Sequence, residues 1–216
     1  MARIIGYRRF GGVEVLEEGS VSLPAPGEGQ VLVTVRAAGI NPVDYKLFGG
    51  LTRPLEVLRT IVHPGRWFAR GADRPLRGVG QDFAGVVAAV GPGVTNMVVG
   101  DEVIGLLRAA PWQVREYGSL ATQLVISADN VVSKPASMSF DVAGGLGVAA
   151  QTAMGATRSV KAEAGDVIVV AAAAGGVGGL VTQLAVARGA TVIGIAGPSN
   201  ADYLRSLGAI PVSYGE

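Results

Sequence analysis

Short apolar runs separated by glycine and proline dominate the first 135 residues. Residues 31–37 and 83–90 are rich in β-branched and apolar side chains, which is typical of strands. Residues 101–105 follow a glycine turn, and residues 119–126 alternate polar and apolar positions, as a half-buried strand does. Short strands at this spacing predict a small β-barrel or sandwich over residues 1–135.

The pattern changes after Pro135. Ser139 can cap a helix, and the alanine-rich segment that follows predicts a helix to about residue 160. Residues 166–172 form a continuous apolar run, which is typical of a parallel strand buried on both faces. Further segments then predict a helix at 177–188, a strand at 191–196, a helix at 201–207 and a strand at 210–214. This order predicts half of a doubly wound sheet over residues 136–216.

A glycine loop, Ala173-Ala174-Gly175-Gly176-Val177-Gly178-Gly179, separates the first of these strands from its helix. Its spacing is that of G-x-G-x-x-G, with Ala173 at the first glycine position. At the second position Gly175 lets the backbone approach a pyrophosphate, and at the third Gly178 lets the helix pack closely on the strand. The phosphates would then bind the N–H groups at the positive end of the helix. The alternative is a glycine-rich turn that binds nothing.

The end of the second strand of this unit indicates which dinucleotide is bound. An NAD site would place Asp or Glu about 20 residues after the loop, where it bonds the ribose diol. Here residues 197–200 contain no carboxylate, so nothing repels a 2′-phosphate. Ser199 and Asn200 can donate hydrogen bonds to such a phosphate, and Arg205 could supply a positive charge; a plain turn and helix cap is the alternative reading. We expect NADP(H).

Composition excludes several classes of protein. Hydrophobic residues make up 49% of the chain and charged residues 16%, which excludes a disordered protein. The absence of cysteine excludes disulfides and thiolate chemistry. A net charge of +1 gives no signal for nucleic acid, although arginines crowd residues 53–77. No apolar stretch of about 18 residues predicts a membrane span. We therefore expect a soluble, cytoplasmic protein with no nucleic-acid or membrane partner.

Several ordered sequence blocks resemble one family. The blocks are Phe10-Gly11-Gly12-Val13-Glu14-Val15-Leu16, Ala38-Gly39-Ile40-Asn41-Pro42-Val43-Asp44, Gly80-Gln81-Asp82-Phe83-Ala84-Gly85-Val86-Val87, Val90-Gly91 and Val99-Gly100-Asp101-Glu102-Val103. With the glycine loop, they resemble zinc-independent quinone oxidoreductases of the zeta-crystallin type, in the medium-chain dehydrogenase/reductase superfamily. The resemblance implies an α/β protein with a β-barrel: a GroES-like catalytic domain (1–135) followed by a Rossmann-like NADP-binding domain (136–216).

The resemblance also implies that catalysis needs no metal. Zinc-dependent relatives place a cysteine near Asn41 and a histidine near Gln81, whereas here His63 is the only histidine. One histidine cannot build a zinc site. The chemistry that remains is hydride transfer from the nicotinamide to a quinone or a conjugated enone. A protein that binds NADPH without turnover, as some crystallin-like or accessory relatives do, is the alternative.

Site residues follow from the same resemblance. Asn41 would lie beside the nicotinamide and the substrate carbonyl, and Tyr45 and Lys46 would polarise an oxygen or deliver a proton. The alternatives are a turn residue for Asn41, core packing for Tyr45 and a surface charge for Lys46, while Asp44 is interpreted as a helix cap. The expected cofactor-binding residues are Thr152, Ala174, Gly175, Gly176, Val177, Gly178, Gly197, Ser199, Asn200 and Tyr214.

Two departures from the family are visible. Residues 51–79 form a longer connection than relatives have, and Leu55, Leu58, Ile61 and Val62 show helical spacing. A lid over the substrate and a surface excursion are both open readings of this insertion. The chain also ends after the third strand of the expected Rossmann domain, where relatives continue. We therefore expect an incomplete form of a protein that is a homodimer at full length.

Overall fold

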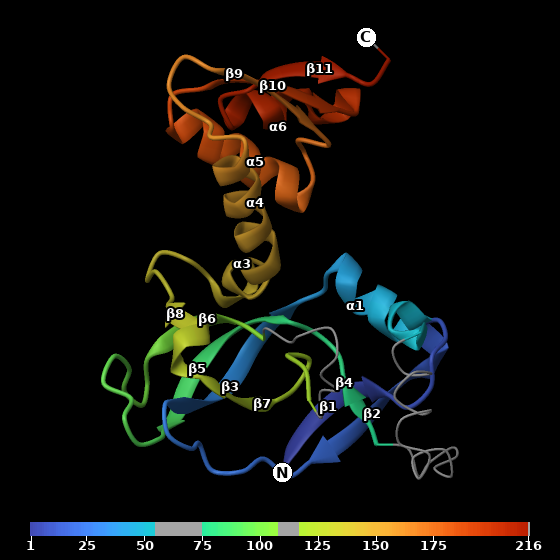
Figure 1. Cartoon of the computed structure of the whole chain (residues 1–216), viewed down its shortest axis with the longest axis vertical. Coiled ribbons are helices and arrows are strands. Elements are labelled where there is room, and N and C mark those ends of the chain that lie inside the picture. The colour runs from blue at the N-terminus through green and yellow to red at the C-terminus, as the bar shows by residue number, and fades with distance from the viewer. Residues whose placement is uncertain (55–74, 108–116, 216) are drawn as a thin grey trace. The chain divides into compact units, whose positions relative to one another are not determined.

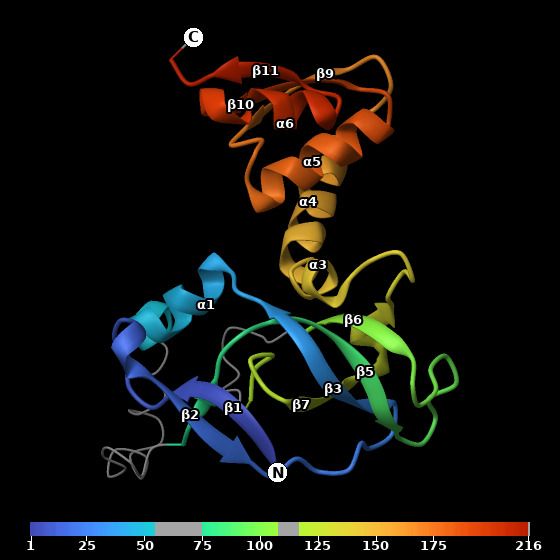
Figure 2. The ribbon, with the colours of Figure 1, turned by 180° about the vertical axis from the view of Figure 1, so that it is seen from behind.

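The computed structural model describes residues 1–54, 75–107 and 117–215 (Figures 1 and 2). The chain divides into two compact units, Met1–Gly147 and Val148–Glu216. The helical pattern expected within residues 51–79 falls largely on residues 55–74, outside the described residues, as does His63.

The main sheet of the first unit is five-stranded and antiparallel, in the order β7-β3-β5-β6-β8. Its strands are β3 (Gln30–Gly39), β5 (Asp82–Val90), β6 (Glu102–Leu106), β7 (Gln123–Ser127) and β8 (Val131–Ser133). Four of these overlap the strands expected from the apolar runs, although β7 begins at Gln123 and not at residue 119. Buried side chains alternate along β3 and β6 but are consecutive in β5 and β7, and Val31, Val33 and Leu124 are fully buried. A side chain at Gly105 would overlap the ring of Phe83, so the strand pair requires glycine there.

A smaller sheet of order β2-β1-β4 lies beside it, formed by β1 (Ala2–Tyr7), β2 (Leu16–Val21) and β4 (Arg77–Gly78). The two sheets are joined by an isolated bridge between Ile4 and Ala121 and by the Ile5 N–H, which donates to the Leu120 carbonyl at 2.8 Å. Within the described residues the expected barrel thus takes the form of two joined sheets that do not close into a ring.

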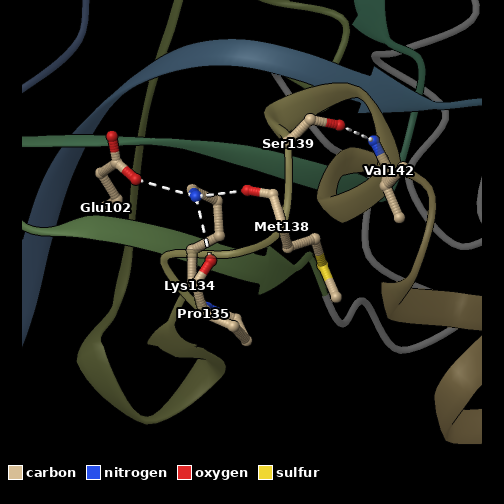
Figure 3. A network of polar contacts seen from close by, with 6 residues as sticks. All are labelled: Glu102, Lys134, Pro135, Met138, Ser139 and Val142. Carbon is tan, nitrogen blue, oxygen red and sulfur yellow. Dashed lines mark hydrogen bonds and ion pairs between the residues drawn. The ribbon is translucent and has the colours of Figure 1, made fainter.

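A short helix, α3 (Phe140–Gly144), packs on β3 and β5, and a polar network holds the chain that leads into it (Figure 3). The side chain of Lys134 is 4% exposed, and its ammonium pairs with the Glu102 carboxylate at 2.8 Å. The ammonium also donates to the carbonyl oxygens of Met138 at 2.6 Å and Pro135 at 3.1 Å. Ser139 caps α3, as expected, by accepting the Val142 N–H. The buried charge is therefore fully hydrogen-bonded, as burial requires.

The second unit is a parallel sheet of order β11-β10-β9, formed by β9 (Val167–Ala171), β10 (Thr191–Ala196) and β11 (Ile210–Ser213). Its helices are α4 (Gly147–Ser159), which begins at the last residue of the first unit, α5 (Gly176–Ala187) and α6 (Ala201–Ser206). The β-α-β-α-β order agrees with the sequence. The single helix expected from Ser139 to residue 160 is instead two helices, α3 and α4, because Gly145 ends the first.

The two faces of this sheet differ. Both α5 and α6 lie on the same face (Figures 1 and 2), where they bury Val170, Val192 and Leu204. On the opposite face, Val167 is 66% exposed and Val169 is 59% exposed. The prediction of a strand buried on both faces is therefore wrong for β9: the helices that follow β9 and β10 both return on one side.

Candidate functional site

The segment that contains Asn41 begins a short helix, α1 (Pro42–Lys46). Asn41 has an extended backbone and occupies the N-cap position, and Pro42 has the φ angle that the first helical residue needs. The Asp44 carboxylate accepts the Asn41 N–H at 2.8 Å, and the Asp44 N–H donates to the Asn41 carbonyl oxygen at 2.9 Å. The interpretation of Asp44 as a helix cap is confirmed, since the two residues form a capping box.

The Asn41 side chain contacts a residue far away in the sequence. Its Nδ2 donates to Oδ2 of Asp82 at 2.8 Å. Asp82 is the first residue of β5 and pairs with Gly39 at the end of β3, so the pairing of these strands brings the two sequence blocks together. Sequence reasoning missed Asp82. Its signal was a carboxylate at the start of an apolar strand, where burial demands a polar partner.

Small residues surround Asp82. A Cβ on Gly147 would lie 2.6 Å from Asp82 Oδ1, and one on Gly39 would lie 2.8 Å from the Gly144 carbonyl oxygen. A Cβ on Gly144 would in turn lie 2.8 Å from that of Ala37. A side chain at Gly39 or Gly144 would therefore push β3 and α3 apart, and one at Gly147 would push the start of α4 away from the carboxylate, so the glycines let the backbone close around Asp82.

The other residues expected in catalysis lie further along α1. Tyr45 is 52% exposed, which argues against core packing as its role, and Lys46 is also exposed. Two apolar neighbours in the same segment are exposed as well, Ile40 at 75% and Leu51 at 61%. The segment thus presents a hydroxyl, an ammonium and apolar side chains close in sequence to Asn41.

In the second unit, the glycine loop connects β9 to α5. The Ala173 N–H donates to the Ile195 carbonyl oxygen at 3.0 Å, which ties the loop to β10. Gly175 is the N-cap of α5, and its carbonyl oxygen accepts the Gly179 N–H at 2.8 Å. The N–H groups of the first helical turn, on Gly176, Val177 and Gly178, precede this bond and point out of the helix end. These donors are the kind of group that binds phosphate.

The loop glycines differ in their surroundings. A Cβ on Gly176 would meet nothing within 4 Å, whereas one on Gly178 would lie closer than 3.0 Å to the Ala172 carbonyl oxygen. The close helix packing expected of Gly178 is thus present. Ala172 itself has a φ of 54°, a conformation that favours glycine. The space beside Gly176 is thus open, next to the N–H groups of the helix N-terminus, which are the kind of donors that bind a diphosphate.

The remaining residues of the second unit lie at the carboxyl ends of the strands. Gly197 follows β10 and accepts the Asn200 N–H at 2.9 Å, in a single turn of 3₁₀ helix, Pro198–Asn200, that leaves Ser199 exposed. Tyr214 follows β11, is 62% exposed, and its N–H donates to the Ala196 carbonyl oxygen at 3.3 Å. The loop, this turn and Tyr214 are therefore at one edge of the sheet, as the ends of parallel strands must be.

Two further candidates are already engaged in local hydrogen bonds. Thr152, on α4, donates its hydroxyl to the Val148 carbonyl oxygen one helical turn earlier, at 2.7 Å. Arg205, on α6, pairs with Asp202 at 2.7 Å, and both side chains are exposed. The Thr152 hydroxyl oxygen can still accept a hydrogen bond, and the Arg205 guanidinium keeps further N–H donors. Among the described residues, no group of three or more His, Cys, Asp or Glu side chains is placed to hold a metal ion.

Residues 27–136 match the family described as alcohol dehydrogenase GroES-like domain. The chain is 36% identical over 208 residues to 2-methylene-furan-3-one reductase of Solanum lycopersicum, covering 94% of this chain and 49% of that protein. It is 35% identical over 208 residues to the chloroplastic NADPH-dependent alkenal/one oxidoreductase of Arabidopsis thaliana, covering 94% of this chain and 50% of that protein.

Solved structures of quinone oxidoreductases are similar to this chain in fold. The quinone oxidoreductase from Coxiella burnetii has a TM-score of 0.80 and 32% identity, covering 99% of this chain and 62% of that one. The Escherichia coli quinone oxidoreductase complexed with NADPH has a TM-score of 0.73 and 27% identity, covering 99% of this chain and 59% of that one. The chain spans about half the length of these two curated relatives. It belongs to the alcohol dehydrogenase GroES-like domain family, within the medium-chain dehydrogenase/reductase superfamily.

Proposed function

We propose that this chain forms the substrate-binding and cofactor-binding parts of an NADPH-dependent reductase that transfers a hydride to a quinone or a conjugated enone without a metal. The observation that carries the proposal is the open space at the N-terminus of α5. It combines the free space at Gly176 with the outward N–H groups of Gly176, Val177 and Gly178. The names of the relatives, alkenal/one oxidoreductase and quinone oxidoreductase, support the substrate class.

The residues at the sheet edge fit an NADP(H) molecule in order along it. Gly175 to Gly178 would hold the diphosphate, with Ala174 beside it, while Gly197, Ser199 and Asn200 would meet the adenosine ribose and its 2′-phosphate. Tyr214 and Thr152 complete the proposed set. The 3₁₀ turn contains no carboxylate, and the next acid, Asp202, is paired with Arg205. When bound, the nicotinamide supplies the hydride, so the protein has to supply position and proton.

In the first unit, the chain's own residues would bind and polarise the acceptor. Asn41 would donate a hydrogen bond to the substrate carbonyl oxygen, and Tyr45 or Lys46 would deliver a proton to that oxygen. The exposed positions of Tyr45 and Lys46 leave both groups accessible to a ligand. Such general acid catalysis contributes typically about 10²–10⁴-fold to a rate.

Acceptor-dependent oxidation of NADPH tests the proposal. The 216-residue chain, and the longer protein that contains it, would be assayed with a quinone, an enone and a saturated ketone as control. We expect oxidation with the first two acceptors only, and a large loss in Asn41→Ala. If neither form oxidises NADPH with any acceptor, the enzymatic proposal is wrong. Tight NADPH binding without turnover would instead favour the alternative of a non-enzymatic NADPH-binding protein.

We also propose a homodimer for the longer protein and a cytoplasmic location. Along the stretches that the structure describes, no helix is both long enough and apolar enough to cross a membrane. Sedimentation of the longer protein would test the homodimer, and a monomer at all concentrations would contradict it.

A further inference from the structure

A buried carboxylate faces the proposed catalytic amide. Asp82 is 0% exposed, and Phe83 and Ala84, which follow it on β5, are also fully buried. A carboxylate in such surroundings is costly unless it accepts hydrogen bonds. It accepts one from Asn41 Nδ2 at 2.8 Å, and a Cβ on Gly147 would lie 2.6 Å from its other oxygen. The carboxylate is therefore held in a site that leaves it little room to move.

This contact decides which way the Asn41 amide points. The last side-chain torsion of asparagine is broad and nearly two-fold, so a free amide exchanges its NH₂ and oxygen positions readily. Oδ2 of Asp82 accepts from Nδ2, so the NH₂ group faces Asp82 and the amide oxygen faces away from it. The capping box with Asp44 also holds this residue, because the Asp44 carboxylate accepts the Asn41 N–H and the Asn41 side chain accepts the Asp44 N–H. Asp82 thus restrains the NH₂ group of the amide, while the capping box restrains the backbone and the amide oxygen.

The orientation matters for the proposed chemistry. Of the two Nδ2 hydrogens, one is used by Asp82, and the second remains the donor that a substrate carbonyl oxygen would need. The hydrogen bond to a carboxyl group that is itself buried and tightly packed holds the amide in this orientation. We propose that Asp82 is a positioning residue, which acts through Asn41 by fixing its carboxamide as a donor. The consequence for turnover rests on the proposed function, whereas the orientation of the amide does not.

Nuclear magnetic resonance of the ¹⁵N-labelled 216-residue chain tests the orientation without turnover. We expect one Asn41 Nδ2 hydrogen to exchange with solvent at least about 10-fold more slowly than the other, because it is the one bonded to Asp82. In Asp82→Ala, which removes the acceptor, the slow exchange should disappear while the backbone signals of β3 and β5 persist. Asp141→Ala, which removes an exposed carboxylate on α3, is the matched control and should leave it unchanged. If both hydrogens of the parent protein exchange at the rate of a free amide, the proposal is overturned, whether or not any variant folds.

Turnover of the longer protein supplies a second readout. Asp82→Ala should lower kcat/KM for the enone about 10-fold or more. In an Asn41→Ala background the same change should have no further effect, because the residue acts only through that amide. Multiplicative losses in the double variant would overturn the positioning role. A protein that shows the slow amide hydrogen but no turnover would contradict the proposed function and leave the positioning of Asn41 supported.

Discussion

A Cβ on Gly178 would lie closer than 3.0 Å to the carbonyl oxygen of Ala172, so the first turn of α5 touches the loop that precedes it. Gly178→Ala should therefore force the helix away from the end of β9. We expect a loss of about 1–3 kcal/mol in the free energy of unfolding, the usual cost of overpacking. Chemical denaturation would measure it. Gly176→Ala, which meets open space, is the control, and equal stability of the two variants would contradict the packing role.

At Gly176, in the same loop, we expect a substitution to affect NADPH binding and not stability. Gly176→Val places a branched side chain in the open space where a diphosphate would lie, while the fold has room for it. We expect NADPH binding to fail and the free energy of unfolding to change by less than about 1 kcal/mol. Fluorescence titration paired with a thermal melt measures both quantities. A variant that binds NADPH like the parent protein would remove the loop from the cofactor site.

Ala172 is a place where the sequence conflicts with its backbone. Its φ of 54° costs an alanine about 1–2 kcal/mol, whereas a glycine there loses about 0.5–1 kcal/mol through the entropy of the unfolded chain. Ala172→Gly should therefore stabilise the protein by about 0.5–1 kcal/mol. Ala171→Gly, one residue earlier in β9, is the matched control and should destabilise. Thermal melts decide the prediction, and it is wrong if both changes lower stability.

In the ion pair between Lys134 and Glu102, loss of the lysine should destabilise the protein more than loss of the glutamate. Lys134→Met removes a buried donor from the Met138 and Pro135 carbonyl oxygens and should cost about 1–3 kcal/mol. Glu102→Gln removes a partner whose side chain is 47% exposed and should cost less than about 1 kcal/mol. Urea denaturation of both variants tests this. Equal costs would mean that the carbonyl contacts contribute little.

A charge at Ser199 should change the preference for NADPH over NADH. Ser199→Asp would place a negative charge on the turn after β10, where the 2′-phosphate is proposed to bind. Two like charges about 4 Å apart repel each other by about 1 kcal/mol in bulk water and by about 4 kcal/mol near a protein surface. NADPH should therefore bind at least about 5-fold more weakly. NADH binding, which involves no such phosphate, should be unchanged. Ser199→Asn is the neutral control. Equal weakening of both cofactors by the aspartate would contradict the prediction.

Strands were predicted most accurately from the sequence where their own residues carry a clear hydrophobic pattern. Residues 191–196, which alternate buried and half-buried positions in the middle of the parallel sheet, match β10 at both ends. The hydrophobic pattern of the sequence did not predict β1 and β2. Residues 16–21 of β2 include two glutamates and a glycine, so their strand structure comes from pairing with β1 and not from propensity. Pairing partners distant in sequence leave no local signal.

The candidate site shows the same limit. The glycine loop was readable because its chemistry lies within seven consecutive residues, and the structure places it between β9 and α5 as expected. Asp82 could not be predicted as a site residue from the sequence, because its role depends on a contact with Asn41 that only the pairing of β3 and β5 creates. The exposure of Tyr45 was also unreadable, since an aromatic residue on a five-residue helix can face either way.

The contact between Asn41 and Asp82 joins residues 41 positions apart and forms only when β3 and β5 have paired. The amide is therefore oriented by the folding reaction, before any ligand arrives. Immobilising a side chain at a binding interface costs about 0.5–1.5 kcal/mol of conformational entropy. For Asn41 that ordering is complete in the folded protein, so a ligand that meets this amide meets a preorganised group.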